Sequence, residues 1–142
     1  MANKVEELPL FQRAEEFTVA VTAILRRPAV GKDFKLRDQI SAANDSITAN
    51  LREGFEQSTD ALFANFVYYS KGSLAEVLAR LHRACSKQYI TNAELEPLIA
   101  SGDELGRMMG GFIRYLSRSG FKNRGRHKLD HPPHQPGGGE QQ

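Results

Sequence analysis

Two carboxylates and two amides stand at positions where they could form one polar site inside a helical protein. Gln39, Asn50 and Glu53 recur at helical spacing, and Glu76 follows in the next amphipathic segment. Carboxylates on facing helices can hold metal ions in a bundle, but di-iron bundles also use inward-facing Glu-x-x-His pairs. The sequence contains no such pair. A metal or catalytic site is therefore the alternative, and a structural hydrogen-bond network is the favoured interpretation.

The predicted network lies beside the apolar stripe of its helix, so its polar groups should be at least half buried. A buried polar group is costly unless it is hydrogen-bonded, and we expect Asn50, Glu53 and Glu76 to interact across two helices. The predicted members are Gln39, Ser46, Asn50, Glu53, Ser73 and Glu76.

Other reactive side chains give no catalytic or cofactor prediction. Cys85 lies on an apolar helical face without a neighbouring histidine or cation in sequence, which favours a core thiol over a nucleophile. His127, His131 and His134 could bind a metal, but their Pro/Gly-rich surroundings favour an incidental cluster. The sequence has no phosphate-binding loop, nucleophile elbow or zinc-type spacing. We therefore expect a protein that is not an enzyme and has no cofactor or metal.

A run of cations near the end of the chain is the feature that predicts a function. Residues 1–106 carry 12 basic and 15 acidic side chains, whereas residues 107–128 carry seven basic and no acidic ones. Tyr115 and Phe121 interleave with the cations, and such a mixture can neutralise phosphates and stack on bases. Two alternatives remain: a solvating tail that complements a helix dipole, and a docking segment for an acidic protein. The cations are Arg107, Arg114, Arg118, Lys122, Arg124, Arg126 and Lys128.

Four amphipathic segments must position these residues. Helical periodicity predicts helices over 9–26 and 35–55, a third from an N-cap near Ser58 to Ser86, and a fourth that opens with the capping box Thr91–Glu94. No segment alternates with period two. The prediction is an all-α, up-down-up-down four-helix bundle over residues 1–119, followed by a disordered tail, basic and then Pro/Gly-rich, over 120–142.

Two helices carry unusual patterns. The apolar face of the third spans about 160°, so this helix is either central or meets another subunit. The fourth contains Gly102, Gly106 and Gly110 at spacing four. Each glycine costs about 1 kcal/mol relative to alanine inside a helix. Either a neighbouring backbone approaches closely there, or the helix breaks near Ser101.

Composition restricts the class of protein. The 142 residues are 40% hydrophobic and 25% charged, as in ordinary globular domains. One cysteine excludes a disulfide framework and fits a reducing compartment. Neither a signal-peptide core nor an apolar run of about 18 residues is present, so we expect no membrane span and a cytoplasmic protein.

Two motifs follow each other in the second and third predicted helices. They consist of Leu36, Gln39, Ile40, Ala43, Ser46, Ile47, Asn50, Glu53 and Gly54, then Gly72, Ser73 and Glu76. These motifs resemble those of the 23S rRNA-intervening-sequence proteins, also called S23 ribosomal proteins. The likeness extends over about residues 8–118, with Leu51 in place of a usual Ile and Arg52 in place of a usually small residue.

The resemblance implies a small four-helix bundle that assembles as a ring-shaped homo-oligomer, a pentamer in known cases. The superfamily includes the accessory protein of diversity-generating retroelements, which binds nucleic acid and a reverse transcriptase. The family name records the location of some of the genes and establishes no ribosomal role. Together with the basic segment, this predicts a non-enzymatic homo-oligomer that binds RNA or DNA. The alternative is a structural or adaptor oligomer that docks a protein partner.

Overall fold

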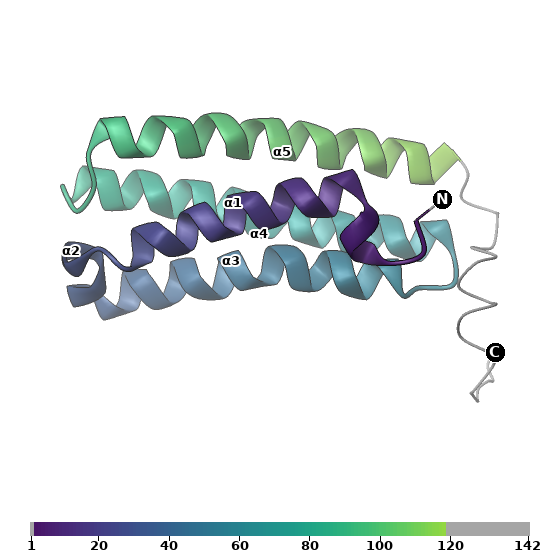
Figure 1. Cartoon of the computed structure of the whole chain (residues 1–142), viewed down its shortest axis with the longest axis horizontal. Coiled ribbons are helices and arrows are strands. Elements are labelled where there is room, and N and C mark those ends of the chain that lie inside the picture. The colour runs from purple at the N-terminus through teal and green to yellow at the C-terminus, as the bar shows by residue number, and fades with distance from the viewer. Residues whose placement is uncertain (1, 119–142) are drawn as a thin grey trace.

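Long antiparallel helices make up most of the chain. The structure is a computed structural model that describes residues 2–118, and the predicted tail at 120–142 lies outside the described residues (Figure 1). The all-α four-helix bundle is confirmed, with no strand among the described residues. The elements are η1 (Val5–Glu7), α1 (Pro9–Leu25), α2 (Pro28–Lys32), α3 (Phe34–Phe55), α4 (Asp60–Ser86) and α5 (Asn92–Arg118).

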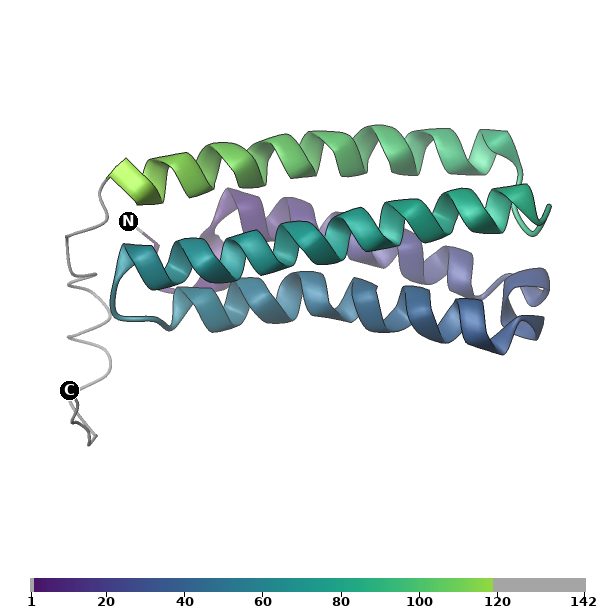
Figure 2. The same ribbon diagram turned by 180° about the vertical axis from the view of Figure 1, so that it is seen from behind.

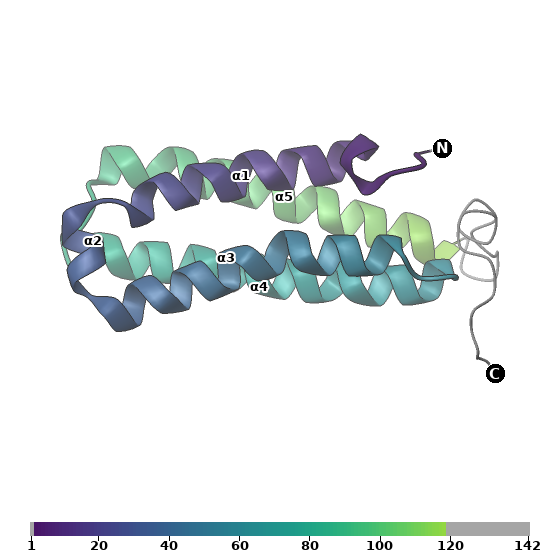
Figure 3. The same cartoon turned by 60° about the horizontal axis from the view of Figure 1, so that its bottom comes forward.

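The four long helices follow an up-down-up-down path. Helix α4 packs along both α3 and α5, and α1 closes the bundle by packing on the same two helices, as Figures 2 and 3 show from two further directions. The wide apolar face of α4 is therefore covered largely within the chain, because it meets two neighbours. The short helix α2 joins α1 to α3 at the end of the bundle opposite the C-terminus of α5.

Side-chain caps begin three of the helices. The Thr91 Oγ1 accepts from the Glu94 amide at 3.1 Å and the Thr91 amide donates to Glu94 Oε1 at 2.9 Å, which confirms the predicted capping box. Thr59, one residue after the expected Ser58, caps α4 by accepting from the Leu62 amide. Asp33 caps α3 in the same way.

Helix α2 differs from the sequence prediction. The stretch that contains Pro28 and Gly31 was expected to end the first helix and form a connection, but Pro28 begins a five-residue helix instead. Proline fits the first helical turn because its missing N–H would have no partner there. The buried Val30 then fixes this turn against the core.

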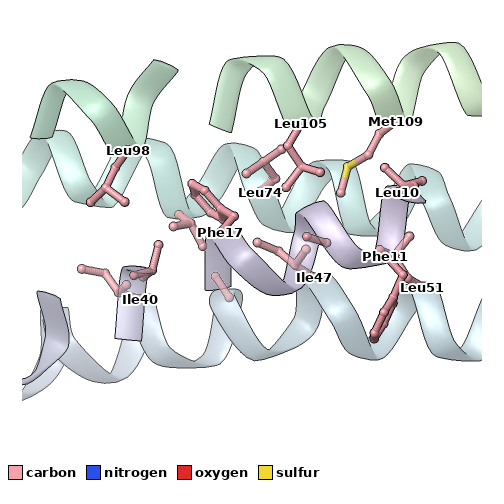
Figure 4. Close-up of a cluster of buried hydrophobic side chains, with 14 of the residues drawn as sticks. Leu10, Phe11, Phe17, Ile40, Ile47, Leu51, Leu74, Leu98, Leu105 and Met109 are labelled. Carbon is pink, nitrogen blue, oxygen red and sulfur yellow. The ribbon is translucent and has the colours of Figure 1, made fainter. Parts of the chain in front are cut away.

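All four long helices contribute to one apolar core (Figure 4). Its aliphatic and aromatic side chains interdigitate along the bundle axis, and those with less than 2% exposure come from every long helix. The largest of these fully buried side chains are Phe11, Val21, Val30, Ile40, Ile47, Phe55, Phe63, Val67, Val77, Leu81, Leu105 and Met109.

Helix α5 is continuous through Ser101, so the alternative of a break there is wrong. The atoms nearest a Cβ at Gly102 belong to side chains and not to the expected neighbouring backbone: the Cβ would lie 2.5 Å from Leu78 Cδ2 and 3.2 Å from Phe17 Cε1. Gly106 and Gly110 have more space: the nearest atoms to a Cβ would be at 3.6 Å and 3.5 Å.

Candidate functional site

Five of the six predicted polar residues lie along the boundary between α3 and α4. The Ser73 hydroxyl donates to Ser46 Oγ at 2.8 Å, and the Asn50 amide donates to both the carbonyl and the hydroxyl oxygen of Ser46 at 2.9 Å. Ser46 thus receives hydrogen bonds from its own helix and from the facing one. All three side chains are half-buried.

Arg80 links Gln39 and Glu76, the remaining two predicted residues at this boundary. Its Nη1 donates to Gln39 Oε1 at 2.9 Å across the helix boundary, and its Nε donates to Glu76 Oε2 at 3.1 Å on its own helix. Arg80 was not predicted as a member, although it lies one turn after Glu76. We call Gln39, Ser46, Asn50, Ser73, Glu76 and Arg80 the polar seam.

The expected interaction of Asn50, Glu53 and Glu76 across the two helices is wrong, because Asn50 bonds to Ser46 and Glu76 bonds to Arg80, each within its own helix. Glu53 is exposed, and its side chain has no hydrogen bond or ion pair with any residue of 2–118. The facing part of α4 presents Phe63 and Phe66 to the adjacent Gly54, so this level of the boundary holds no polar partner. The Glu76 side chain is also 48% exposed. The polar seam lies at the outer margin of the interface, where water competes for the carboxylates.

Two polar residues that were not predicted for the network lie deeper. Ser70 is fully buried and donates to the Ile47 carbonyl at 2.6 Å. Asn44 is 2% exposed; its Nδ2 donates to the Thr18 carbonyl at 3.0 Å, and its Oδ1 is buried without a hydrogen-bond partner. Asn44 could have been found from the sequence, because it shares a helical face with Ile40 and lies one turn after it.

Asp33 is the centre of a second polar cluster. Its Oδ2 accepts from Lys87 Nζ at 3.0 Å and from the Tyr89 hydroxyl at 2.9 Å, while Oδ1 caps α3. The hydrogen bond from Lys87, followed by those from the Leu36 amide and Tyr89, lowers the pKa of Asp33 to about 2. The cluster ties the start of α3 to the connection between α4 and α5.

Cations gather at a groove between α4 and α5. Arg107 and Arg114 on α5, both predicted, line it together with Lys71 on α4. Arg118 is exposed at the end of α5. None of these four has an ion pair within residues 2–118, and the predicted Lys122, Arg124, Arg126 and Lys128 lie outside the described residues. Lys71 was not predicted, because a single lysine on an exposed helix face has no distinguishing pattern.

The histidine and the cysteine within residues 2–118 have ordinary surroundings. His82 is exposed, and the half-buried Cys85 thiol donates to Asn92 Oδ1 at 3.1 Å. The three tail histidines lie outside the described residues. Within residues 2–118, no three His, Cys, Asp or Glu side chains are grouped closely enough to hold a metal ion. Nor does any helix of this part combine the length and apolarity needed to cross a membrane.

These features define the class of protein as an antiparallel four-helix bundle with a polar seam between its second and third long helices. The chain belongs to the 23S rRNA-intervening sequence protein family, whose profile matches residues 6–111. No curated protein matches it. A solved structure of similar fold is a protein with unknown function of the S23 ribosomal protein family from Bacteroides thetaiotaomicron VPI-5482. That structure has a TM-score of 0.66 and 21% identity, and the alignment covers 73% of this chain and 97% of the other.

Proposed function

We propose that the chain is a non-enzymatic, homo-oligomeric bundle of the cytoplasm that binds RNA or DNA through its basic segment, residues 107–128. The observation that carries the proposal is the state of Arg107, Arg114 and Arg118. They are exposed on one helix and lack ion pairs among the described residues, and four further cations follow them in the sequence with no acidic residue between.

Ion pairing elsewhere in the bundle makes this state informative. Within residues 2–118, five of the seven arginines outside α5 pair with carboxylates, whereas none of the three arginines of α5 does so. A row of exposed cations can bind the phosphates of a nucleic acid, since each neutralised phosphate releases condensed counterions. The paired arginines are Arg13, Arg27, Arg37, Arg52 and Arg80.

Exposed apolar side chains on α4 support the homo-oligomer. Leu62 is 42% and Tyr69 54% exposed, and Phe66 contacts the Tyr69 ring edge-to-face at 5.7 Å between centroids. A second subunit could cover these three side chains. Gathering several basic segments in one particle would strengthen weak individual contacts. The pentamer implied by family resemblance is one such particle.

Truncation tests the nucleic-acid contact. Binding of the full chain and of a chain that ends at Ser119 should be compared with single- and double-stranded RNA and DNA at two salt concentrations. The shorter chain lacks four cations per subunit and should lose most binding, while its helicity and oligomeric size stay unchanged. Full retention of binding would move the contact onto the bundle. Absence of binding by both chains would contradict the proposal and favour the adaptor that docks a protein.

Light scattering at micromolar concentration tests the assembly separately. We expect a mass of several subunits that does not change when the chain ends at Ser119. A monomer would contradict the homo-oligomer and remove the contribution of multivalency.

A further inference from the structure

Two cationic side chains from different helices converge over Gly110. A Cβ placed on this glycine would lie 3.5 Å from Nη1 of Arg114 and 3.8 Å from Cε of Lys71. Arg107 lies two helical turns before Arg114, about 10 Å along the axis, on the same groove. Asp103 is the one carboxylate among the lining residues. This part of the surface therefore concentrates unpaired positive charge around a concave floor.

The glycines of that floor are not all needed by the packing of the bundle. At Gly102 a Cβ would displace the side chain of Leu78, whose Cδ2 lies 2.5 Å from that position. At Gly106 and Gly110, however, a Cβ would make ordinary van der Waals contacts, and glycine is a poor helix former. Their effect is to keep the groove open between the cations. An extended ligand can then approach the backbone of α5.

An exposed aromatic ring lies near the Lys71 end of the groove on α4, outside the groove lining itself, with its centroid 6.5 Å from that of the Tyr69 ring. Leu78, Leu74 and Lys71 lie opposite Gly102, Gly106 and Gly110, which fixes the antiparallel register of the two helices. Tyr68 comes one turn beyond Lys71, towards the end of α5, and is 66% exposed. An exposed ring beside a row of cations suits an unpaired base, which stacks without sequence preference.

From these observations we infer that the α4–α5 groove binds a single strand of RNA or DNA. Lys71, Arg107 and Arg114 contact its phosphates, and Tyr68 stacks on a base. The inference rests on the proposed function and deepens it, since it adds two residues of α4 to the basic segment. A duplex would engage the cations but not Tyr68, because its bases are already stacked. An acidic peptide would likewise leave the ring unused.

Three variants of the full chain test the groove with a labelled 12-nucleotide oligouridylate, a duplex RNA and polyglutamate as probes. Lys71→Gln should make the negative slope of log affinity against log salt less steep by about 0.7 for the single strand. Tyr68→Ala should weaken single-strand binding at least about fivefold and leave duplex binding unchanged. Gly106→Met should weaken single-strand binding by occupying the groove without a change in charge.

Each variant has a counterpart at the other end of the bundle. Lys32→Gln and Gly31→Met on α2 repeat the charge and size changes, and Phe34→Ala removes another exposed ring. These three should bind as the natural chain does. Circular dichroism checks the fold. If Gly106→Met loses helicity, the double variant Gly106→Ala and Gly110→Ala replaces it, since both methyl groups fit.

The outcomes distinguish the groove inference from the proposed function. Groove variants that bind like their counterparts, while the chain ending at Ser119 still loses binding, would overturn the groove and leave the proposed function intact. Loss of duplex binding equal to loss of single-strand binding in Tyr68→Ala would overturn the stacking contact. Polyglutamate that displaces the oligonucleotide at equal charge concentration would assign the groove to an acidic protein. A natural chain that binds no nucleic acid would overturn both.

Discussion

Gly54 of α3 packs directly against Phe66 of α4. A Cβ on Gly54 would lie 2.8 Å from the Cβ of Phe66 and 2.7 Å from Cδ1 of the buried Phe63. The Cβ of Phe66 cannot move without its backbone, so this contact sets how closely the two helices approach at their joined end. The glycine is a packing requirement.

The first prediction contrasts Gly54→Ala with Gly72→Ala. The first variant should unfold with a free energy lower by about 1–3 kcal/mol, because α3 and α4 must separate to admit the methyl group. Gly72 is a helix glycine with no atom within 4 Å of the Cβ position. Its substitution should raise stability by up to about 1 kcal/mol, the difference in helix propensity. Urea unfolding monitored by circular dichroism measures both, and equal effects would contradict the assigned contact.

The second prediction concerns the polar seam. Ser46→Ala removes the acceptor of Ser73 and one acceptor of Asn50, and should lower the unfolding free energy by about 0.5–1.5 kcal/mol. Glu53→Ala should change it by less than about 0.5 kcal/mol, since the carboxylate is exposed. Denaturant midpoints with unchanged slopes give the comparison. A larger loss in Glu53→Ala than in Ser46→Ala would return Glu53 to the network.

These outcomes show which features the sequence could predict. Helical periodicity was enough for the four long helices, and the Thr91–Glu94 spacing identified a capping box because the interaction is local. The exposure of Glu53 depends on what α4 presents at that level. A helical stripe indicates which way a side chain points but not how far the neighbouring helix covers it. The predicted polar network was therefore expected to be more buried than it is.

Contacts that depend on register were out of reach for the same reason. Lys71 joins Arg114 only because α4 and α5 align Lys71 with Gly110. Asp33 meets Lys87 and Tyr89 across more than 50 positions of sequence. The sequence pattern of one helix does not show how it aligns with another helix, so neither set of contacts could be predicted. The basic composition of 107–128, by contrast, is visible in the sequence.

The third prediction is a pH dependence. The pKa of Asp33 is about 2 in the folded chain against an ordinary value of 3.8, so the fold favours its ionised form. The stabilisation is present above about pH 4 and is lost as the pH falls through about 2. Asp33→Asn should therefore be less stable at pH 7 and show a smaller loss of stability than the natural chain between pH 4 and 2.

Asp45→Asn supplies the control for that measurement. Asp45 is exposed and has no side-chain partner within residues 2–118, so its variant should follow the natural chain across the same range. Thermal midpoints recorded at half-unit pH intervals resolve the difference. Parallel curves for the natural chain and Asp33→Asn would show that the cluster with Lys87 and Tyr89 does not hold the carboxylate.

The fourth prediction tests the arginines of α5 without shortening the chain. The triple variant Arg107→Gln, Arg114→Gln and Arg118→Gln removes three cations that are exposed and unpaired within residues 2–118. If each contacts one phosphate of a single strand, the negative slope of log affinity against log salt should become less steep by about 2. Titrations at four salt concentrations give this slope.

Arg26 and Arg83 provide matched charges elsewhere on the bundle. Both are exposed and without ion pairs among the described residues. The double variant Arg26→Gln and Arg83→Gln should leave the slope unchanged, because slopes count phosphate contacts and not net charge alone. If both variants make the slope less steep in proportion to the charge removed, binding follows the overall charge of the oligomer. In that case α5 has no privileged role, and the four cations beyond Ser119 become the principal candidates for the contact.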